Sequence, residues 1–204
     1  MIIEILQIIL VLLTGVVFHE YAHGWVAYKL GDPTAKLAGR LTLNPLKHID
    51  PLGTIIVPVI LKLLGVAPLG WAKPVPINFA LLRNPKRDII WVAIAGPAAN
   101  IILAIFSSQL LHIKNLPTAV IELLVFVIII NLILATFNLI PIPPLDGSRI
   151  LIGILPNAWS RLYSRLEPYG FLIIIVLLNL GVLNFIMPIV EYFSSQLGVE
   201  IRLK

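Results

Sequence analysis

The first apolar stretch of the chain, Ile2–Leu30, reads IIEILQIILVLLTGVVFHEYAHGWVAYKL. Apolar residues dominate it as far as Phe18, and the only helix-weakening residues in the whole stretch are Gly15 and Gly24. A helix needs about 20 predominantly apolar residues to cross a bilayer. The stretch therefore predicts one long membrane-spanning helix, which carries His19, Glu20 and His23 in its C-terminal half.

The composition of the whole chain also indicates a membrane protein. Of its 204 residues, 59% are hydrophobic and 12% are charged, whereas soluble domains carry about 25% charged residues. So few charges cannot cover a globular core with polar surface, which leaves lipid as the surrounding solvent. Cysteine is absent, which excludes thiolate metal sites. The length fits a single domain of several spans over residues 1–204.

The formal net charge of +5 does not indicate nucleic-acid binding. Nine of the fifteen basic residues lie between Phe18, where the first apolar run ends, and Ile89, where the positive-inside rule places cytoplasmic sequence. They are Lys29, Lys36, Arg40, Lys47, Lys62, Lys73, Arg83, Lys86 and Arg87. Membrane topology therefore accounts for the charge.

Three further segments have the length of a membrane span: Ile89–Leu111, Ala119–Phe137 and Phe171–Met187. Between the first apolar stretch and the span that begins at Ile89, Gly39–Asn44 shows the short alternation of a strand. The apolar run Leu52–Val66 contains Pro58 and Lys62, so a re-entrant or interfacial segment is at least as good an interpretation as a span.

The basic stretch Ser148–Pro168 fits an interfacial loop or amphipathic helix, and equally a plain connector. Taken together, the segments predict an all-α polytopic membrane protein with a bundle of about four to six transmembrane helices. A small β-hairpin or re-entrant insertion is expected after the first helix.

The spacing His19-Glu20-x-x-His23 is typical of a zinc site on a helix. Residues four apart on a helix differ by about 40° in direction and about 6 Å in rise, so both imidazoles can face one metal. The intervening Glu20 can then reach a metal-bound water. Ionisable side chains inside a span cost a few kcal/mol each, which favours a metal or a polar cavity. The alternative is that all three merely lie where the helix leaves the bilayer.

A catalytic zinc needs a third protein ligand, and the remaining candidates are few. They are Asp32, His48, Asp50, Asp88, His112, Glu122, Asp146, Glu167, Glu191 and Glu200. Most lie in polar loops, at span ends or near the C-terminus, but Asp146 follows a span and three prolines that exclude a helix before it. If Leu52–Val66 does not cross the membrane, the predicted topology brings Asp146 to the same membrane face as His19 and His23.

Three motifs give the chain a resemblance to the site-2 protease family of intramembrane zinc metalloproteases, peptidase family M50. They are Phe18–Gly24, Gly96–Asn100 and Asn138–Gly147, and the resemblance covers roughly Val16–Leu151. It implies that His19, His23 and Asp146 bind one Zn²⁺ ion and that Glu20 is the catalytic base. It also implies that Asn138 helps to hold the substrate or the oxyanion. This would be a minimal form of the family without a PDZ or CBS domain.

Asn100 has two interpretations from the sequence. Its amide could contact the substrate or support the site, or it could make a hydrogen bond between helices. The small residues around it, Gly96, Ala98 and Ala99, are explained well by close helix packing alone.

The expected activity is hydrolysis of peptide bonds in or near transmembrane segments of membrane-protein substrates. The active site is expected on the cytoplasmic side of a prokaryotic membrane, with Gly39–Asn44 pairing to an extended substrate. Two other classes stay open on the sequence alone: a metal-ion transporter and a catalytically silent membrane scaffold.

Overall fold

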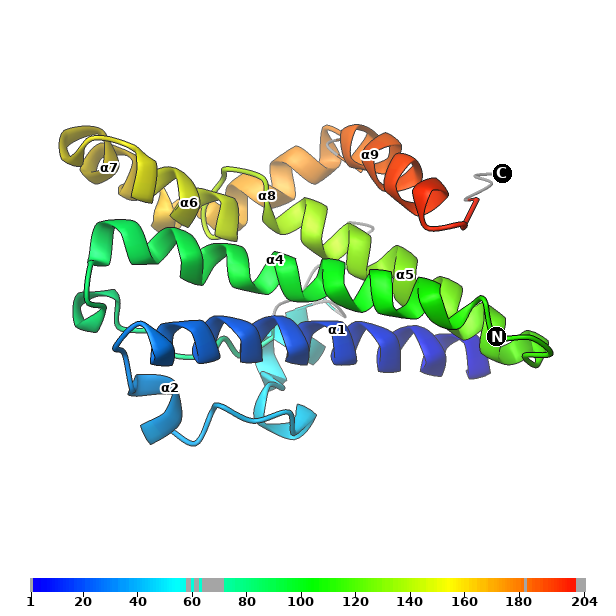
Figure 1. Ribbon diagram of the computed structural model, residues 1–204. Coiled ribbons are helices and arrows are strands. Elements are labelled where there is room, and N and C mark those ends of the chain that lie inside the picture. Colours follow the sequence, from blue (N-terminus) through cyan, green and yellow to red (C-terminus); the bar gives the residue numbers. More distant parts are fainter. Residues whose placement is uncertain (1, 58–59, 61–62, 64–71, 182, 201–204) are drawn as a thin grey trace.

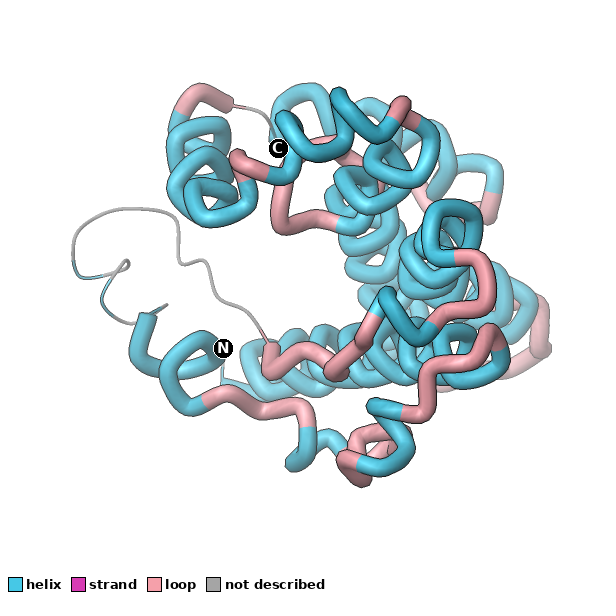
Figure 2. The backbone as a smooth tube through the Cα atoms, turned by 90° about the vertical axis from the view of Figure 1, so that its left-hand side faces the viewer, coloured by secondary structure: helices cyan, strands magenta, loops and turns pink. Residues whose placement is uncertain are grey.

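The computed structural model describes residues 2–57, 60, 63, 72–181 and 183–200 of the chain. Within these residues the structure is helical and contains no β-strand, as Figure 2 shows in a view along the bundle. The first helix, α1, runs over Ile2–Lys29, so the predicted long helix is confirmed. It ends just before Gly31, whose positive φ of 117° is a conformation that favours glycine.

Helix α4 (Pro85–Leu110) is the centre of the bundle. It packs against α1 on one side and against α5 (Thr118–Asn138) and α6 (Asp146–Ile154) on others, and α1, α4 and α5 run side by side in Figure 1. Pro85 begins α4 at a position where a missing N–H costs nothing. The main buried cluster joins α4, α5 and α9 (Leu183–Gln196), and its core includes Ala104, Ile128 and Val190.

Three helical stretches are long and apolar enough to cross a membrane: Pro85–Leu110, Thr118–Asn138 and Asn157–Asn179. The last combines α7 (Asn157–Ser164), a 3₁₀ turn η4 (Glu167–Tyr169) and α8 (Gly170–Asn179). Large apolar side chains such as Ile102 and Phe106 are more than half exposed on α4, as expected for a helix that faces lipid. The chain is therefore an integral membrane protein. That α1 also spans the bilayer stays a prediction.

The predicted span Phe171–Met187 is wrong as a single helix. Helix α8 ends at Asn179, and α9 begins at Leu183. Between them Gly181 has a φ of 85°, the left-handed conformation with which many helices end. The stretch Ser148–Pro168 is helical over most of its length, in α6 and α7, which agrees with the helix interpretation and not with a plain connector.

The insertion after α1 consists of short helical turns and loops. These are α2 (Thr34–Leu37), a 3₁₀ turn η1 (Pro45–Lys47), a π-helical turn η2 (Pro51–Ile56) and a second 3₁₀ turn η3 (Phe79–Leu81). Apart from η2, most of the predicted re-entrant run Leu52–Val66 lies outside the described residues, so whether it spans or re-enters stays a prediction.

The predicted strand Gly39–Asn44 is not formed. The polar groups of Thr42 and Asn44 bond locally instead of to a partner strand. The Asn44 side chain accepts from the Leu46 amide at 3.0 Å, and the Asn44 amide donates to Thr42 Oγ1 at 3.2 Å. The Thr42 carbonyl accepts from His48 Nε2 at 2.9 Å. The hairpin is therefore replaced by a loop with a capped 3₁₀ turn.

An irregular segment, residues 72–78, follows this insertion and passes beside α1. Three contacts fix its path: the Lys73 amide donates to the His48 carbonyl at 2.9 Å, Arg40 donates to the Lys73 carbonyl at 2.7 Å, and the Asn78 amide donates to Asp32 at 2.7 Å. Asp32, Arg40 and His48 are all buried. These polar residues of the insertion therefore hold segment 72–78 in place next to the predicted site.

Candidate metal centre

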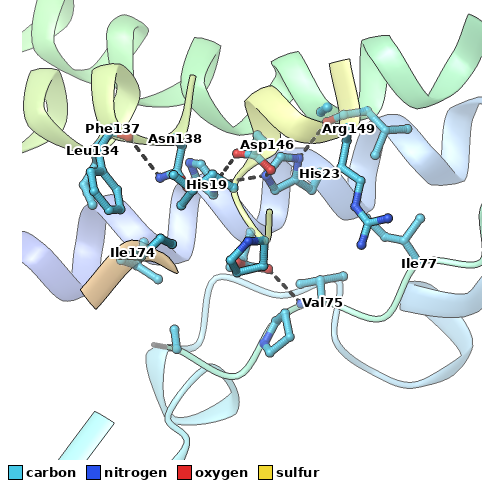
Figure 3. A pocket seen from close by; sticks show the side chains of 18 of the residues that line it. His19, His23, Val75, Ile77, Leu134, Phe137, Asn138, Asp146, Arg149 and Ile174 are labelled. Carbon is cyan, nitrogen blue, oxygen red and sulfur yellow. Dashed lines mark hydrogen bonds and ion pairs between the residues drawn. The ribbon is translucent and has the colours of Figure 1, made fainter. Parts of the chain in front are cut away.

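The three predicted metal ligands converge in the structure. His19 and His23 are buried one turn apart on α1, with their Nε2 atoms 3.0 Å apart. The Asp146 carboxylate lies with Oδ2 3.0 Å from Nε2 of His19 and Oδ1 3.2 Å from Nε2 of His23. Figure 3 shows the three side chains pointing toward one another. One ligand atom from each residue lies within 4.8 Å of the others, a grouping that could hold a metal ion.

A tight turn brings Asp146 to the histidines. After α5 ends at Asn138, the chain turns through hydrogen bonds from the Ile142 amide to the Ile140 carbonyl and from the Leu145 amide to the Ile142 carbonyl. A Cβ atom on the following residue, Gly147, would collide with the Leu139 carbonyl, so only glycine allows this close return. Asp146 is itself the first residue of α6, and the predicted non-helical backbone ends just before it.

The hydrogen bond that each Nδ1 atom makes determines which ring nitrogen of the imidazole can bind a metal. His19 Nδ1 lies 2.7 Å from Asn100 Oδ1, and His23 Nδ1 lies 2.6 Å from the Val92 carbonyl oxygen. Both oxygens can only accept, so both Nδ1 atoms donate, and in a neutral ring each Nε2 then carries a lone pair. A hydrogen bond from the ring nitrogen that does not bind the metal is typical of metal-bound histidine.

The resulting set of donor atoms fits zinc. Two Nε2 lone pairs and a carboxylate lie within 3.0–3.2 Å of one another, an arrangement that repels itself without a cation. Asp146 Oδ2 is buried and accepts no hydrogen bond. Ligands about 2.0–2.1 Å from a tetrahedral zinc ion are separated from each other by about 3.3 Å, close to the spacing observed.

Gly96 on α4 makes room for the two rings. A Cβ atom at this position would lie 2.6 Å from Nε2 of His19 and closer still to Nε2 of His23. The sequence explains Gly96 by helix packing alone, whereas in the structure it directly faces the Nε2 atoms of His19 and His23. A glycine on one helix opposite two ligands on another is a pattern that only the three-dimensional arrangement reveals.

The ligands open onto a cavity of about 560 Å³. Glu20, His19, His23, Asp146 and Asn138 all contribute to its wall, together with residues of segment 72–78 and of α8. The Oε2 atom of Glu20 accepts a hydrogen bond of 2.7 Å from the Val75 amide. The predicted base therefore borders the same space as the predicted metal ligands, and its orientation is tied to segment 72–78.

The two asparagines of the predicted site have different surroundings. Asn138 borders the cavity, and its amide donates to the Leu134 carbonyl at 2.9 Å. Asn100 is fully buried, bonds to His19 and is not among the residues that line the cavity. This placement favours the interpretation that Asn100 supports His19 and does not contact the substrate.

Sequence reasoning did not identify Asn131 of α5. This residue is not among those that line the cavity, but its Oδ1 atom accepts a hydrogen bond from the Asn100 amide. The available signal was a lone amide inside an apolar span, where polar residues are commonly functional.

The chain is similar to known proteins over most of its length. Residues 7–116 and 108–181 match the model for peptidase family M50. The chain is 39% identical over 194 residues to the "Putative zinc metalloprotease YwhC" of Bacillus subtilis, which covers 91% of this chain and 82% of that protein.

It is 32% identical over 192 residues to the "Putative zinc metalloprotease Rip2" of Mycolicibacterium smegmatis, covering 92% of this chain and 73% of that protein. It is also 28% identical over 188 residues to the "Zinc metalloprotease MJ0392" of Methanocaldococcus jannaschii, covering 90% and 46% of the two chains. No solved structure matches the chain.

Proposed function

The chain belongs to peptidase family M50, and on that premise we propose that it is an intramembrane zinc endopeptidase of the site-2 protease type. Its proposed reaction is hydrolysis of peptide bonds in or near transmembrane segments of membrane proteins. The observation that carries this proposal is the convergence of His19, His23 and Asp146 beside Glu20 on one cavity of an integral membrane protein.

Each residue of the site has a proposed role. His19, His23 and Asp146 hold the Zn²⁺ ion, which when bound lowers the pKa of water and polarises a carbonyl. Glu20 takes the proton of the attacking water and then donates it to the leaving amine. Asn138, which borders the same cavity, is proposed to donate its amide to the substrate or its oxyanion.

The cavity wall supports an apolar, extended substrate. Val16, Ile77, Phe137, Phe171 and Ile174 all border it. A transmembrane helix hides its carbonyls in its own hydrogen bonds, so a substrate must unwind locally before it can be attacked. We propose that the unwound stretch lies along segment 72–78, because this irregular segment borders the cavity whereas Gly39–Asn44 does not.

The charge pattern supports a cytoplasmic site. Lys29 ends α1 six residues beyond His23, and Lys36 follows in α2. By the positive-inside rule these residues support a cytoplasmic position for this end of α1, in a prokaryotic membrane. We propose that residues 1–204 form one metalloprotease domain with its active site toward that face.

Glu20→Gln tests the proposal. The amide oxygen of Gln can still accept from Val75, so the fold and the metal ligands are preserved, but the side chain can no longer accept a proton. In liposomes containing a labelled membrane-protein substrate, we expect the variant to retain zinc and to lose cleavage. The matched control is Glu122→Gln, at an exposed position of α5, which should cleave normally.

Other outcomes assign the protein to the other classes. Transport of zinc into the liposomes by the wild type, without cleavage of any helical substrate, would indicate a transporter. Wild-type protein that binds zinc but neither cleaves nor transports would indicate a scaffold. Full cleavage by Glu20→Gln would overturn the assigned role of Glu20.

A further inference from the structure

A chain of buried side-chain hydrogen bonds connects three helices behind the metal centre. The Asn131 amide donates to the Val127 carbonyl of α5 at 2.8 Å, and Asn131 Oδ1 accepts from the Asn100 amide of α4 at 2.8 Å. The same Asn100 amide donates to the Gly15 carbonyl of α1 at 3.1 Å, and Asn100 Oδ1 accepts from His19. Asn100 is 0% exposed and Asn131 is 1% exposed.

The direction of each bond follows from the backbone carbonyls at the ends of the chain. The Val127 carbonyl can only accept, so it determines that Asn131 presents its NH₂ group there and its oxygen to Asn100. Asn100 then faces two acceptors, the Asn131 oxygen and the Gly15 carbonyl, and must present its NH₂ group to both. Its own oxygen is left for His19, whose Nδ1 therefore carries the proton.

From this order of bonds we propose that Asn131 is a positioning residue for zinc, acting through Asn100 to set the tautomer of His19. With the proton on Nδ1, the lone pair of Nε2 faces Asp146, where the metal binds. If the Asn100 amide turned over, its NH₂ group would face Nδ1, and the ring would place its proton on Nε2. That tautomer cannot bind zinc through Nε2.

The backbone of α1 provides space for this contact. A Cβ atom at Gly15 would lie 2.9 Å from Asn131 Oδ1, so a side chain there would push the amide away. The glycine and the asparagine are 116 positions apart in the chain. Their close approach is a second observation, independent of the hydrogen bonds, that the structure makes room for Asn131 beside α1.

The two histidines differ in how they are oriented. His23 Nδ1 donates directly to the Val92 carbonyl of α4, a backbone acceptor that needs no further support. His19 depends on a side-chain amide that could turn over. Replacing Asn131 should therefore disturb the orientation of His19 alone. Zinc binding is then weakened, but not every ligand is removed.

The test is zinc affinity of the purified full chain, measured by competition with a chromophoric chelator. Asn131→Leu keeps a γ-branched shape but removes the oxygen that accepts from Asn100. We expect zinc to bind about 10–100-fold more weakly, the range found when an outer-shell partner is removed. Asn179→Leu is the matched control, because Asn179 makes the same bond to the carbonyl four residues earlier, at 2.8 Å, on the exposed face of α8.

Two further measurements separate positioning from a merely structural role. The visible absorption bands of the Co²⁺-loaded protein should shift in Asn131→Leu and not in Asn179→Leu, because only the first changes the ligand field. Asn131→Asp should restore most of the affinity, since a protonated carboxyl can accept from Asn100 and donate to Val127.

A folded Asn131→Leu protein with wild-type zinc affinity and unchanged Co²⁺ bands would overturn the proposal. If that variant does not fold, Asn131→Ala tests the same contact in a smaller side chain, and wild-type affinity there would equally overturn it. The inference rests on the zinc site of the proposed function but not on proteolysis. Because affinity is measured without substrate, failure of this inference is distinguishable from failure of the proposed reaction.

Discussion

Gly96→Ala should remove zinc from the site. The added methyl carbon would lie 2.6 Å from Nε2 and from Cε1 of His19, and nearer still to Nε2 of His23. Ordinary contacts of this kind are about 3.5 Å, so the methyl is about 1 Å too close to both rings. Helix α4 cannot simply move away, because it packs between α1, α5 and α6. The rings must turn instead.

Turning the rings breaks their bonds to Asn100 and to the Val92 carbonyl, so both nitrogen ligands lose their orientation. We therefore expect zinc affinity to fall at least about 100-fold, which corresponds to about 2.8 kcal/mol. The assay is metal content by elemental analysis of the detergent-purified protein, together with chelator competition.

Gly153→Ala is the control for crowding of α4 in general. A Cβ atom at Gly153 would collide with Cγ1 of Ile90 and lie 3.1 Å from Cγ2 of Ile89, two residues of α4 that are not among those lining the cavity. This variant should retain zinc. Folded Gly96→Ala protein with a full complement of zinc and wild-type affinity would refute the packing of both ligands against Gly96.

Three other predictions follow from individual contacts. Asp146→Ala should purify with little zinc while its helical circular dichroism is unchanged; full zinc content would exclude Asp146 as the third ligand. Asp32→Ala should lower the thermal unfolding midpoint and reduce the free energy of unfolding by about 2–3 kcal/mol, because the buried carboxylate accepts a hydrogen bond from the Asn78 amide. An unchanged midpoint would contradict this anchoring of segment 72–78. Arg149→Ala should lower the free energy of unfolding by at most about 1 kcal/mol, because its ion pair with Glu167 is partly exposed. A decrease several times larger in the same melting experiment would show that the pair is not a surface one.

The features predicted well are those set by local periodicity. The apolar run of α1 and the four-residue spacing of His19 and His23 depend only on helix geometry, so both are visible in the sequence. The prolines before Asp146 likewise indicate where helical structure is interrupted. Because these signals lie within a few residues of one another, no knowledge of packing is needed to detect them.

The features predicted poorly depend on competition between local bonds or on distant contacts. Gly39–Asn44 has the alternation of a strand, but the side chain of Asn44 caps a turn instead. The span Phe171–Met187 is largely apolar, yet Gly181 adopts a positive φ and separates two helices. Asn131 belongs to no local motif, and its partner Asn100 lies on another helix, so only packing reveals its contact.

The close packing of Gly96 against His19 and His23 affects how fast a bound zinc ion can exchange with its surroundings. Helix α4 covers one side of both imidazoles, where Gly96 lies against the Nε2 atoms and the Nδ1 atoms are bonded to Asn100 and Val92. The open approach is the cavity bordered by Glu20 and segment 72–78. An inhibitor that fills this cavity would therefore trap zinc kinetically, and the rate at which a chelator strips the protein would report how much of the inhibitor is bound.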